Sequence, residues 1–267
     1  MSLSITFLIL AHDSVERVCR LVNKLVSEDS SCKIVVHFDK ASGKKKKKHL
    51  ESSLVNVNNC HVLHKSVTCG WGRWGLVKAS LMMLDYAQND KATDYYFLLS
   101  EYCFPIQPLS KLMLHLEENT GANFIECSDS SWIKSGLRED RYLYRHFLDK
   151  RKSPKLHRWL YKFQKIIGLK RNVPKDLEVH FGSQWWCLTH SAVKYVLSRD
   201  KRVCSFFKWA WIPDECFFQT IIAKSGFQVL PPLTYYCFGR DGKPLILNSK
   251  FIGFDNSRNY YFARKYV

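Results

Sequence analysis

Short apolar runs alternate with amphipathic stretches along the first part of the chain. Residues 5–10, 32–38 and 95–99 are mostly apolar and rich in branched or aromatic side chains, which is typical of strands buried on both faces of a sheet. Between the first two runs, apolar residues repeat at helical spacing, at Val15, Val18, Leu21, Val22 and Leu25. This strand–helix–strand unit predicts parallel strands joined by a right-handed crossover.

The rest of the chain predicts further elements of both kinds. Helices are expected over residues 76–87, 109–118 and 191–197, and short strands over residues 59–64, 123–126 and within 181–188. Residues 138–171 are basic and aromatic. Trp159, Phe163 and Ile166 keep helical spacing there, so core packing is expected to explain most of the aromatic content. After Leu230 the tail is predicted to be irregular. No repeat or long linker interrupts the pattern, which favours one compact domain over residues 1–267.

Polar side chains follow the predicted strands at the ends where they would share one edge of the sheet. His12 and Asp13 follow the first strand, Asp39 and Lys40 follow the second, and Ser100 and Glu101 follow the run at 95–99. In open parallel sheets, ligands bind at the carboxyl ends of the strands. The sequence therefore predicts a binding site at this edge.

A second candidate site lies in residues 212–222. Pro213 suits the first turn of a helix, Asp214 and Glu215 follow where the helix dipole favours acidic groups, and Phe218, Ile221 and Ile222 supply a core-facing stripe. One interpretation is that both acids only favour the helix start. The other is that Glu215 is a general base, held in place and ionised near neutral pH.

Composition limits the class of protein and its partners. Hydrophobic residues make up 46% of the chain and aromatic residues 14%, which excludes a disordered protein. The net charge of +17 predicts an anionic partner: a nucleic acid, a membrane surface or a phosphorylated small molecule. Five consecutive lysines, Lys44 to Lys48, are placed on a surface loop, with peripheral contact to an anionic membrane as one interpretation and a solvated charge run as the other.

The sequence also bears on compartment and metal content. No apolar run approaches the length of a membrane span, and the N-terminal run lacks a basic flank, so a cytoplasmic protein is expected, peripheral to the inner face of the membrane at most. The ten cysteines contain no Cys-x-x-Cys pair. A zinc site is therefore not expected, and reduced thiols are.

Eight short segments, in order along the chain, together resemble the core-2/I-branching β-1,6-N-acetylglucosaminyltransferase family, which includes peptide xylosyltransferases. They are the first strand with Ala11-His12, Val36-His37-Phe38-Asp39-Lys40, Gly72-Arg73-Trp74 with Val77-Lys78-Ala79, Leu98-Leu99-Ser100 with Phe104-Pro105-Ile106, Asn123-Phe124-Ile125-Glu126, Gly182-Ser183-Gln184-Trp185, Pro213-Asp214-Glu215 with Gln219-Thr220, and Phe262-Ala263-Arg264-Lys265. Any one alone is weak, but their order makes chance a poor explanation.

The resemblance implies an α/β protein with a GT-A type fold, a Rossmann-like and mostly parallel sheet flanked by helices. Residues 1–130 would bind the nucleotide, and residues 131–267 the acceptor. It further implies an inverting transferase that uses a UDP-sugar, GlcNAc favoured and xylose or another sugar behind it. Glu215 would be the base. The chain has no Asp-x-Asp, and the family needs no metal and no other cofactor.

The resemblance also suggests binding residues, each with a structural alternative. Donor contacts are expected from His12, Asp39, Trp74, Ser100, Glu101, Arg264 and Lys265, with a further basic partner at Arg240 or Lys243. Acceptor contacts are expected from Arg138, Arg141, Tyr144, Trp185 and Asp214. The alternatives are turn-forming polar residues, aromatic anchors of core or loops, and a solvated basic helix face. The acceptor would be a glycan or a lipid-linked oligosaccharide.

The sequence departs from the family at one segment. Family members often show Ser-Gly-x-Asp after the fourth strand, where this chain has Ser100-Glu101-Tyr102-Cys103. The absence of an anchor suggests a short, soluble member of bacterial or viral type. Two other functions stay open. One is nucleic-acid binding, motivated by the charge although no recognition motif supports such a partner, and the other is a sugar-binding relative without activity.

Overall fold

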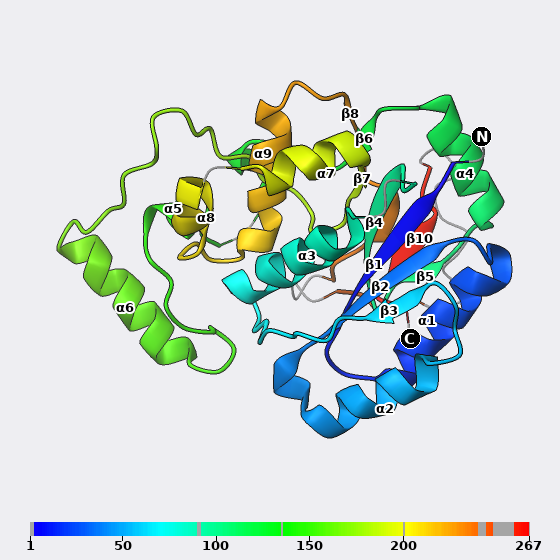
Figure 1. The fold of residues 1–267 in the computed structure, drawn as a ribbon. Coiled ribbons are helices and arrows are strands. Elements are labelled where there is room, and N and C mark those ends of the chain that lie inside the picture. Colours follow the sequence, from blue (N-terminus) through cyan, green and yellow to red (C-terminus); the bar gives the residue numbers. More distant parts are fainter. Residues whose placement is uncertain are drawn as a thin grey trace.

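The computed structural model describes residues 3–89, 92–134, 136–199, 201–239, 244–247 and 259–266, and its centre is a seven-stranded sheet (Figure 1). The strands are β1 (Ile5–Ala11), β2 (Lys33–Phe38), β3 (Cys60–Val62), β4 (Tyr95–Ser100), β6 (Asn123–Phe124), β7 (Cys187–Thr189) and β8 (Val229–Leu230). Their order is β3-β2-β1-β4-β7-β6-β8. The first four are parallel, β7 runs antiparallel to β4 and β6, and β8 is parallel to β6.

Helices cover both faces of this sheet (Figure 1). Those that pack on it are α1 (Val15–Glu28), α2 (Lys44–Leu54), α3 (Trp74–Ala87), α4 (Leu109–Glu118), α7 (His190–Leu197), α8 (Lys201–Phe207) and α9 (Phe217–Lys224), whereas α5 (Asp140–Leu143) and α6 (Pro154–Ile166) lie to one side of it. Short 3-10 turns are η1 (Lys40–Ser42), η2 (Ser130–Trp132) and η3 (Pro213–Glu215). The predicted α/β class, with a mostly parallel central sheet flanked by helices, is confirmed.

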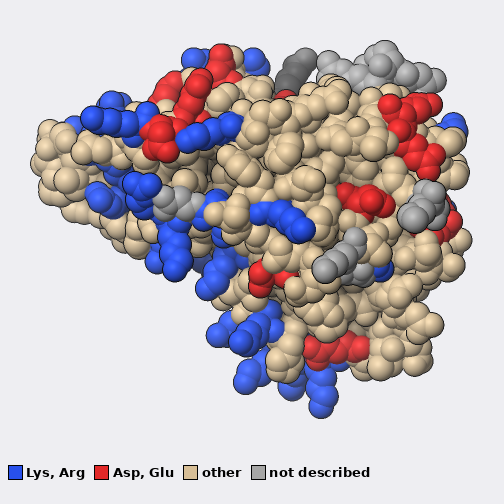
Figure 2. Space-filling view, turned by 45° about the horizontal axis from the view of Figure 1, so that its top comes forward, with Lys and Arg blue, Asp and Glu red and all other residues tan. Residues whose placement is uncertain are grey.

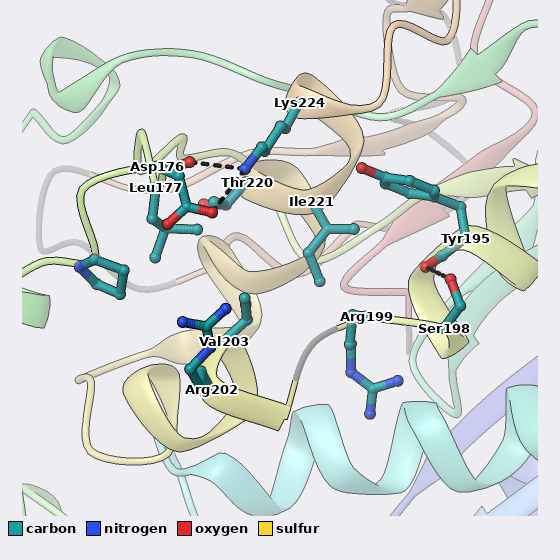
Figure 3. Close-up of a pocket in the computed structure, with 11 residues that line it drawn as sticks. Asp176, Leu177, Tyr195, Ser198, Arg199, Arg202, Val203, Thr220, Ile221 and Lys224 are labelled. Atoms are coloured by element: carbon teal, nitrogen blue, oxygen red, sulfur yellow. Dashed lines mark hydrogen bonds and ion pairs between the residues drawn. The ribbon is translucent and has the colours of Figure 1, made fainter.

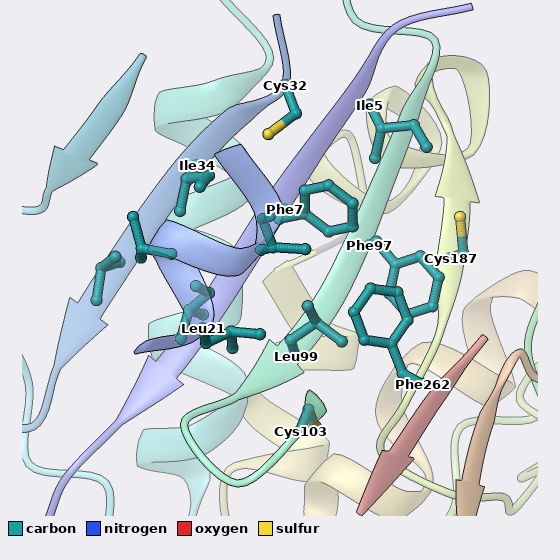
Figure 4. Close-up of a cluster of buried hydrophobic side chains, with 14 of the residues drawn as sticks. Ile5, Phe7, Leu21, Cys32, Ile34, Phe97, Leu99, Cys103, Cys187 and Phe262 are labelled. Carbon is teal, nitrogen blue, oxygen red and sulfur yellow. The ribbon is translucent and has the colours of Figure 1, made fainter. Parts of the chain in front are cut away.

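Alternation along β1 divides the core into two layers. Phe7 and Ile9 pack with α1, α2 and α4 on one face, whereas Leu8 and Leu10 pack with α3, α7, α8 and α9 on the other. Successive side chains of a strand point to opposite faces, so a central strand must be apolar throughout to serve both layers. The first layer, shown in Figure 4, also receives Phe262 from the C-terminal segment.

The tail is more regular than predicted. Residues after Leu230 form β9 (Thr234–Tyr236) and β10 (Phe262–Arg264), and these join β5 (Phe104–Pro105) in a second, three-stranded sheet. Phe262 is fully buried, with its ring 4.8 Å from that of Phe97. These strands are two or three residues long, too short for a periodic pattern to reveal them.

Two further predictions were wrong, and one helix was missed. Lys44 to Lys48 belong to helix α2, since lysine is a good helix former and Leu50 and Leu54 supply a buried edge. Helix α8 was missed. Trp159, Phe163 and Ile166 of α6 lie on the surface instead of in the core, because the buried face of α6 is built from His157 and Gln164. All ten cysteines are described and free, which agrees with the expected reduced thiols.

Candidate active site

The polar residues predicted at the strand ends do meet at one edge of the sheet. The carboxyl ends of β1, β2 and β4 lie together because these strands are parallel and in register. Strand β7 is antiparallel to β4, so the loop that precedes it, residues 182–186, reaches the same edge. The residues that follow β6 arrive there as well, and they include Glu126.

Glu101 organises the loop between β1 and α1. Its side chain has no exposed surface, and its two oxygens accept hydrogen bonds from the backbone N–H groups of His12, Asp13 and Ser14 at 3.0–3.2 Å. The His12 ring is 63% exposed and lies 2.9 Å from the same carboxylate, which raises the pKa of His12. Glu101 therefore holds the loop and has no surface left for a donor, whereas the His12 ring is accessible.

Asp39 and Ser100 both accept hydrogen bonds from nearby backbone groups in the loops at the strand ends, which for Asp39 is the turn-forming role given as its alternative; donor contact by either residue stays a prediction. The Asp39 carboxylate accepts hydrogen bonds from the backbone N–H groups of Ala41 at 2.7 Å and Cys69 at 3.1 Å. The Ser100 hydroxyl accepts from Tyr102 N–H at 3.3 Å and lies 3.5 Å from the Cys103 thiol. Burial raises the pKa of Cys103, so a neutral thiol stands where the family often has an aspartate.

The segment that carries Glu215 is held by a close backbone approach. Pro213–Glu215 forms the turn η3, and the helix begins only at Phe217, so the predicted helix start lies four residues too early. The N–H of Ile212 donates to the carbonyl of Gly72 at 3.1 Å. Gly72 has a φ of 64°, and a Cβ there would come within 3.1 Å of the Trp211 ring. The glycine loop before α3 therefore fixes the turn.

Glu215 is the carboxylate best placed for chemistry. Its side chain is 25% exposed, and its Oε2 lies 2.7 Å from a guanidinium nitrogen of Arg141, which is almost fully buried. Arg141 also donates from Nε to the carbonyl of Leu137 at 2.9 Å, so its position is fixed. Burial raises the pKa of Glu215, the Arg141 charge and hydrogen bond oppose this rise, and the charge of Glu126 adds to it.

Glu126 and Tyr236 join the site, although neither was predicted as a site residue. The Glu126 carboxylate accepts hydrogen bonds from the Tyr236 hydroxyl and from Ser183 N–H, both at 2.9 Å. Gly182 is required beside it, because a Cβ would lie 1.9 Å from the Glu126 carbonyl oxygen. The signal for Glu126 was its place directly after a predicted strand. No signal marked Tyr236, since the tail was expected to be irregular.

Asp214 is buried beside Glu215. Burial, followed by the charge of Glu215, raises the pKa of Asp214 to about 7, and the charges of Arg141 and Arg264 act in the opposite direction. Its Oδ1 has no hydrogen-bond partner among the described residues. The pair Asp214–Glu215 therefore shares a site in which one of two adjacent carboxyls is readily protonated at neutral pH.

The C-terminal strand brings cationic groups to the same region. The Arg264 guanidinium lies 4.7 Å from the centre of the Trp185 ring, and its Nε is buried without a hydrogen-bond partner in the described part of the chain. Burial lowers the pKa of Arg264, and the charge of Asp214 opposes this. Lys265 lies 4.3 Å above the Tyr102 ring. Arg240 and Lys243 lie outside the described residues.

The other predicted site residues are spread between this site and the core. Trp185 is buried and serves as a platform for Arg264. Trp74 packs edge-to-face on Phe217 at 5.2 Å, and Tyr144 is buried. Arg138 is exposed on the surface. Of the three residues 138, 141 and 144, the structure brings Arg141 to Glu215.

A separate pocket of about 270 Å³ lies between α7, α8, α9 and the loop at residues 174–177 (Figure 3). Lys224 spans its rim and donates to the carbonyl and carboxylate of Asp176 at 2.9 and 3.1 Å. Glu215 does not line it. Over the described ranges we find no cluster of three His, Cys, Asp or Glu side chains suited to a metal, and no helix long and apolar enough to cross a membrane.

Comparisons with known proteins give a consistent assignment. The sequence model of the Core-2/I-branching enzyme family matches residues 5–230. Xylosyltransferase oxt of Drosophila melanogaster is 27% identical over 66% of this chain and 19% of its own length. Xylosyltransferase 2 of Rattus norvegicus is 25% identical over 83% of this chain and 24% of its own length. This chain therefore spans about a quarter or less of these two relatives.

Solved structures resemble the fold only distantly. The structure of S. aureus TarS matches with a TM-score of 0.40 and 10% identity, covering 77% of this chain and 34% of that one. A putative glucose-1-phosphate thymidylyltransferase from Bacillus anthracis matches with a TM-score of 0.42 and 9% identity over 85% and 87%. Neither bears on activity. The family match covers most of the chain, and on that ground the chain belongs to the Core-2/I-branching enzyme family of glycosyltransferases.

Proposed function

We propose that this chain is an inverting glycosyltransferase that moves a sugar from a UDP-sugar to a hydroxyl group of a glycan, with Glu215 as general base. The observation that carries the proposal is the Glu215 carboxylate, a quarter exposed at the edge of the sheet, with one oxygen held at 2.7 Å by Arg141. Membership of a glycosyltransferase family supports the reaction class.

The surroundings of Glu215 suit a base that must be ionised and yet accept a proton. Arg141 favours the carboxylate, whereas burial and Glu126 raise its pKa towards the working pH, where a general base is most effective. Oε2 of Glu215 accepts a hydrogen bond from Arg141, and no hydrogen bond to its Oε1 is found among the described residues. Oε1 is therefore the atom that would take the proton of the acceptor hydroxyl.

The proposed reaction is a single displacement. The acceptor oxygen forms a bond to the anomeric carbon while its proton passes to Glu215. The bond from that carbon to the phosphate oxygen breaks, and UDP leaves with the electron pair. Because attack and departure occur on opposite faces, an α-linked donor gives a β-linked product.

Arg264 and Lys265 are proposed to stabilise the departing diphosphate without a metal. Negative charge grows on the leaving group as the bond breaks, and a positive group fixed beforehand lowers the barrier most. The Arg264 side chain is partly buried, its Nε is buried without a hydrogen-bond partner among the described residues, and a guanidinium with unused donors gains by binding a phosphate oxygen. The proposal is thus supported by an unsatisfied donor as well as by charge.

Two donor sugars need comparison. GlcNAc is favoured by the resemblance stated from the sequence, and xylose is favoured by the names of the relatives, which are xylosyltransferases. The acceptor is proposed to be a glycan or a lipid-linked oligosaccharide. No nucleic-acid partner is proposed.

The test is a thermal-shift panel of UDP-GlcNAc, UDP-xylose, UDP-glucose and UDP-galactose, with the matching GDP-sugars as controls. The true donor should raise Tm in proportion to the logarithm of its concentration, because it binds only the folded chain. UDP release in the presence of acceptors then measures turnover. A chain protected by RNA or DNA and by no UDP-sugar would contradict the proposal, and protection by a sugar without UDP release for any acceptor would indicate an inactive relative.

A further inference from the structure

Helix α6 buries polar side chains and exposes apolar ones, which is the reverse of a normal surface helix. Figure 1 places it at the outer end of the molecule, away from the central sheet. The residues it buries are polar, namely His157 and Gln164. Gln164 accepts from the N–H of Arg145 at 3.0 Å and donates to the carbonyl of the same residue at 2.9 Å, and the His157 ring lies 3.3 Å from that of His146. The helix is therefore attached to the protein by hydrogen bonds and by ring contacts, such as those of His157 with Trp211 and of Tyr161 with Tyr144.

The outer surface of α6 and the turn after it is apolar. Trp159 is 59% exposed and Ile166 is 83% exposed, although both are residue types that normally lie inside a protein. The exposed apolar side chains are Leu156, Trp159, Phe163, Ile166, Ile167 and Leu169, which we call the α6 stripe. Trp159 and Phe163 are stacked, with ring centres 5.5 Å apart. A contiguous patch of this kind marks a contact surface.

Basic residues surround the α6 stripe. Residues 150–171 contain nine lysines and arginines and no acidic residue. Figure 2 shows blue side chains gathered on the projecting end of the molecule, where Figure 1 places α6, with uncharged surface between them and a group of red side chains along the upper side. An amphipathic helix with Trp, Phe and Leu on one side and Lys and Arg around them is typical of helices that lie in the interface of a bilayer.

We propose that the α6 stripe docks this protein onto an anionic membrane surface. The positive charge of residues 150–171 favours an anionic partner. It disfavours a second copy of the chain, which would bring two sets of nine positive charges together, and these repel. The exposed apolar residues then distinguish between two anionic partners, a nucleic acid and a membrane. A nucleic acid can stack on Trp159 but offers nothing to cover Ile166 and Ile167, whereas acyl chains cover all of them.

The contacts of α6 connect this surface to the candidate active site. The Tyr161 hydroxyl donates to the Asp140 carboxylate, and Lys165 lies 3.3 Å from it. Asp140 precedes Arg141, the residue that holds Glu215. Docking through α6 would place the site close to the bilayer, which suits a lipid-linked acceptor. The membrane contact itself does not depend on the proposed activity.

The test is co-sedimentation of the full chain with vesicles of phosphatidylcholine, pure or mixed in equal parts with phosphatidylserine. The wild-type chain should bind the mixed vesicles, and salt should weaken the binding. The triple variant Trp159→Ser, Phe163→Ser, Ile166→Ser should lose at least about tenfold in affinity. The triple variant Lys155→Gln, Arg158→Gln, Lys162→Gln should lose about fivefold for each charge removed.

A matched control separates α6 from α2. The triple variant Lys44→Gln, Lys45→Gln, Lys48→Gln removes the same number of exposed charges from α2, and it should bind nearly as well as the wild type. Circular dichroism should show all variants folded, since every changed side chain is exposed. Equal binding by the α6 serine variant, or a larger loss in the α2 variant, would overturn the proposal. So would duplex DNA binding that the serine variant abolishes while vesicles remain unbound.

Discussion

Replacing Arg141 by methionine should move the pH dependence of sugar transfer to higher pH. Methionine keeps most of the length and the packing against Trp211, but it removes the charge that lies 2.7 Å from Glu215. An opposite charge at this distance lowers a carboxyl pKa by about one to three units. Because Glu215 is a quarter exposed, solvent screens part of the interaction, and we expect the pKa of Glu215 to rise by an amount at the lower end of this range.

The direction of the change in the pH profile follows from the role of Glu215 as the base. Glu215 must be deprotonated, so kcat/KM should rise with pH through its pKa and then level off. The variant should lose about tenfold at pH values below both pKa values and recover towards wild type above them. Breaking the ion pair also lowers the free energy of unfolding, by about 3 to 5 kcal/mol for a fully buried pair and by about 2 kcal/mol here. The variant should therefore be assayed at a temperature well below its lowered Tm.

The assay is UDP release measured from pH 5 to pH 9 with saturating donor. Arg158→Met is the matched control, because it removes an exposed arginine that has no part in the site. Its profile should superimpose on that of the wild type. An equal loss for Arg141→Met at every pH would refute the reasoning, since it would mean that Arg141 binds the acceptor and does not set the pKa of Glu215.

Three further predictions concern Arg264, Asp214 and the linkage of the product. Arg264→Ala should reduce transfer by at least about a hundredfold with Tm nearly unchanged, and the wild type should keep full activity in EDTA; manganese-dependent rescue after EDTA would show that a metal site has been overlooked. Asp214 has a pKa raised to about 7 in the folded chain, so its contribution to stability is present at acid pH and is lost as pH rises through 7. The free energy of unfolding of Asp214→Asn, relative to that of the wild type, should therefore rise by about 2 kcal/mol as the pH is raised from 5 to 8. Urea titration at each pH measures both values, and a difference between variant and wild type that does not change with pH would contradict the prediction. The product should be β-linked, and an anomeric coupling constant typical of an α linkage would argue against single displacement.

How much of the fold could be predicted from the sequence depends on how many residues each periodic pattern spans. Strands β1, β2 and β4 and helix α4 were predicted nearly to the residue, since their patterns run over five or more positions. Strands β9 and β10 were missed because two or three residues show no period. They form through pairing with each other and of β10 with β5, a strand far away in the sequence.

Helix α6 shows a different limit of sequence reasoning. Its spacing was interpreted correctly as helical, but the direction of its apolar face was not. Periodicity shows which side chains share a face and says nothing about what covers that face. Here His157 and Gln164 find partners inside, and Trp159 and Ile166 are left outside.

The candidate site was predicted in part. The motif placed Glu215, and the structure adds the Arg141 ion pair. Glu101 could not be assigned from sequence, because its role depends on backbone N–H groups 87 to 89 positions away. The raised pKa of Asp214 and of Glu215 follows from burial, which the prediction that Glu215 stays ionised had not considered.

The most direct test of the account is transfer by Glu215→Gln. Glutamine keeps the shape of the side chain but cannot accept the acceptor proton, so transfer should fall by about 10² to 10⁴-fold or more. Donor protection in the thermal-shift assay should stay close to that of the wild type. Glu117→Gln, an exposed substitution on α4, should transfer normally. Turnover by Glu215→Gln within about threefold of the wild type would contradict the assignment of Glu215 as the base.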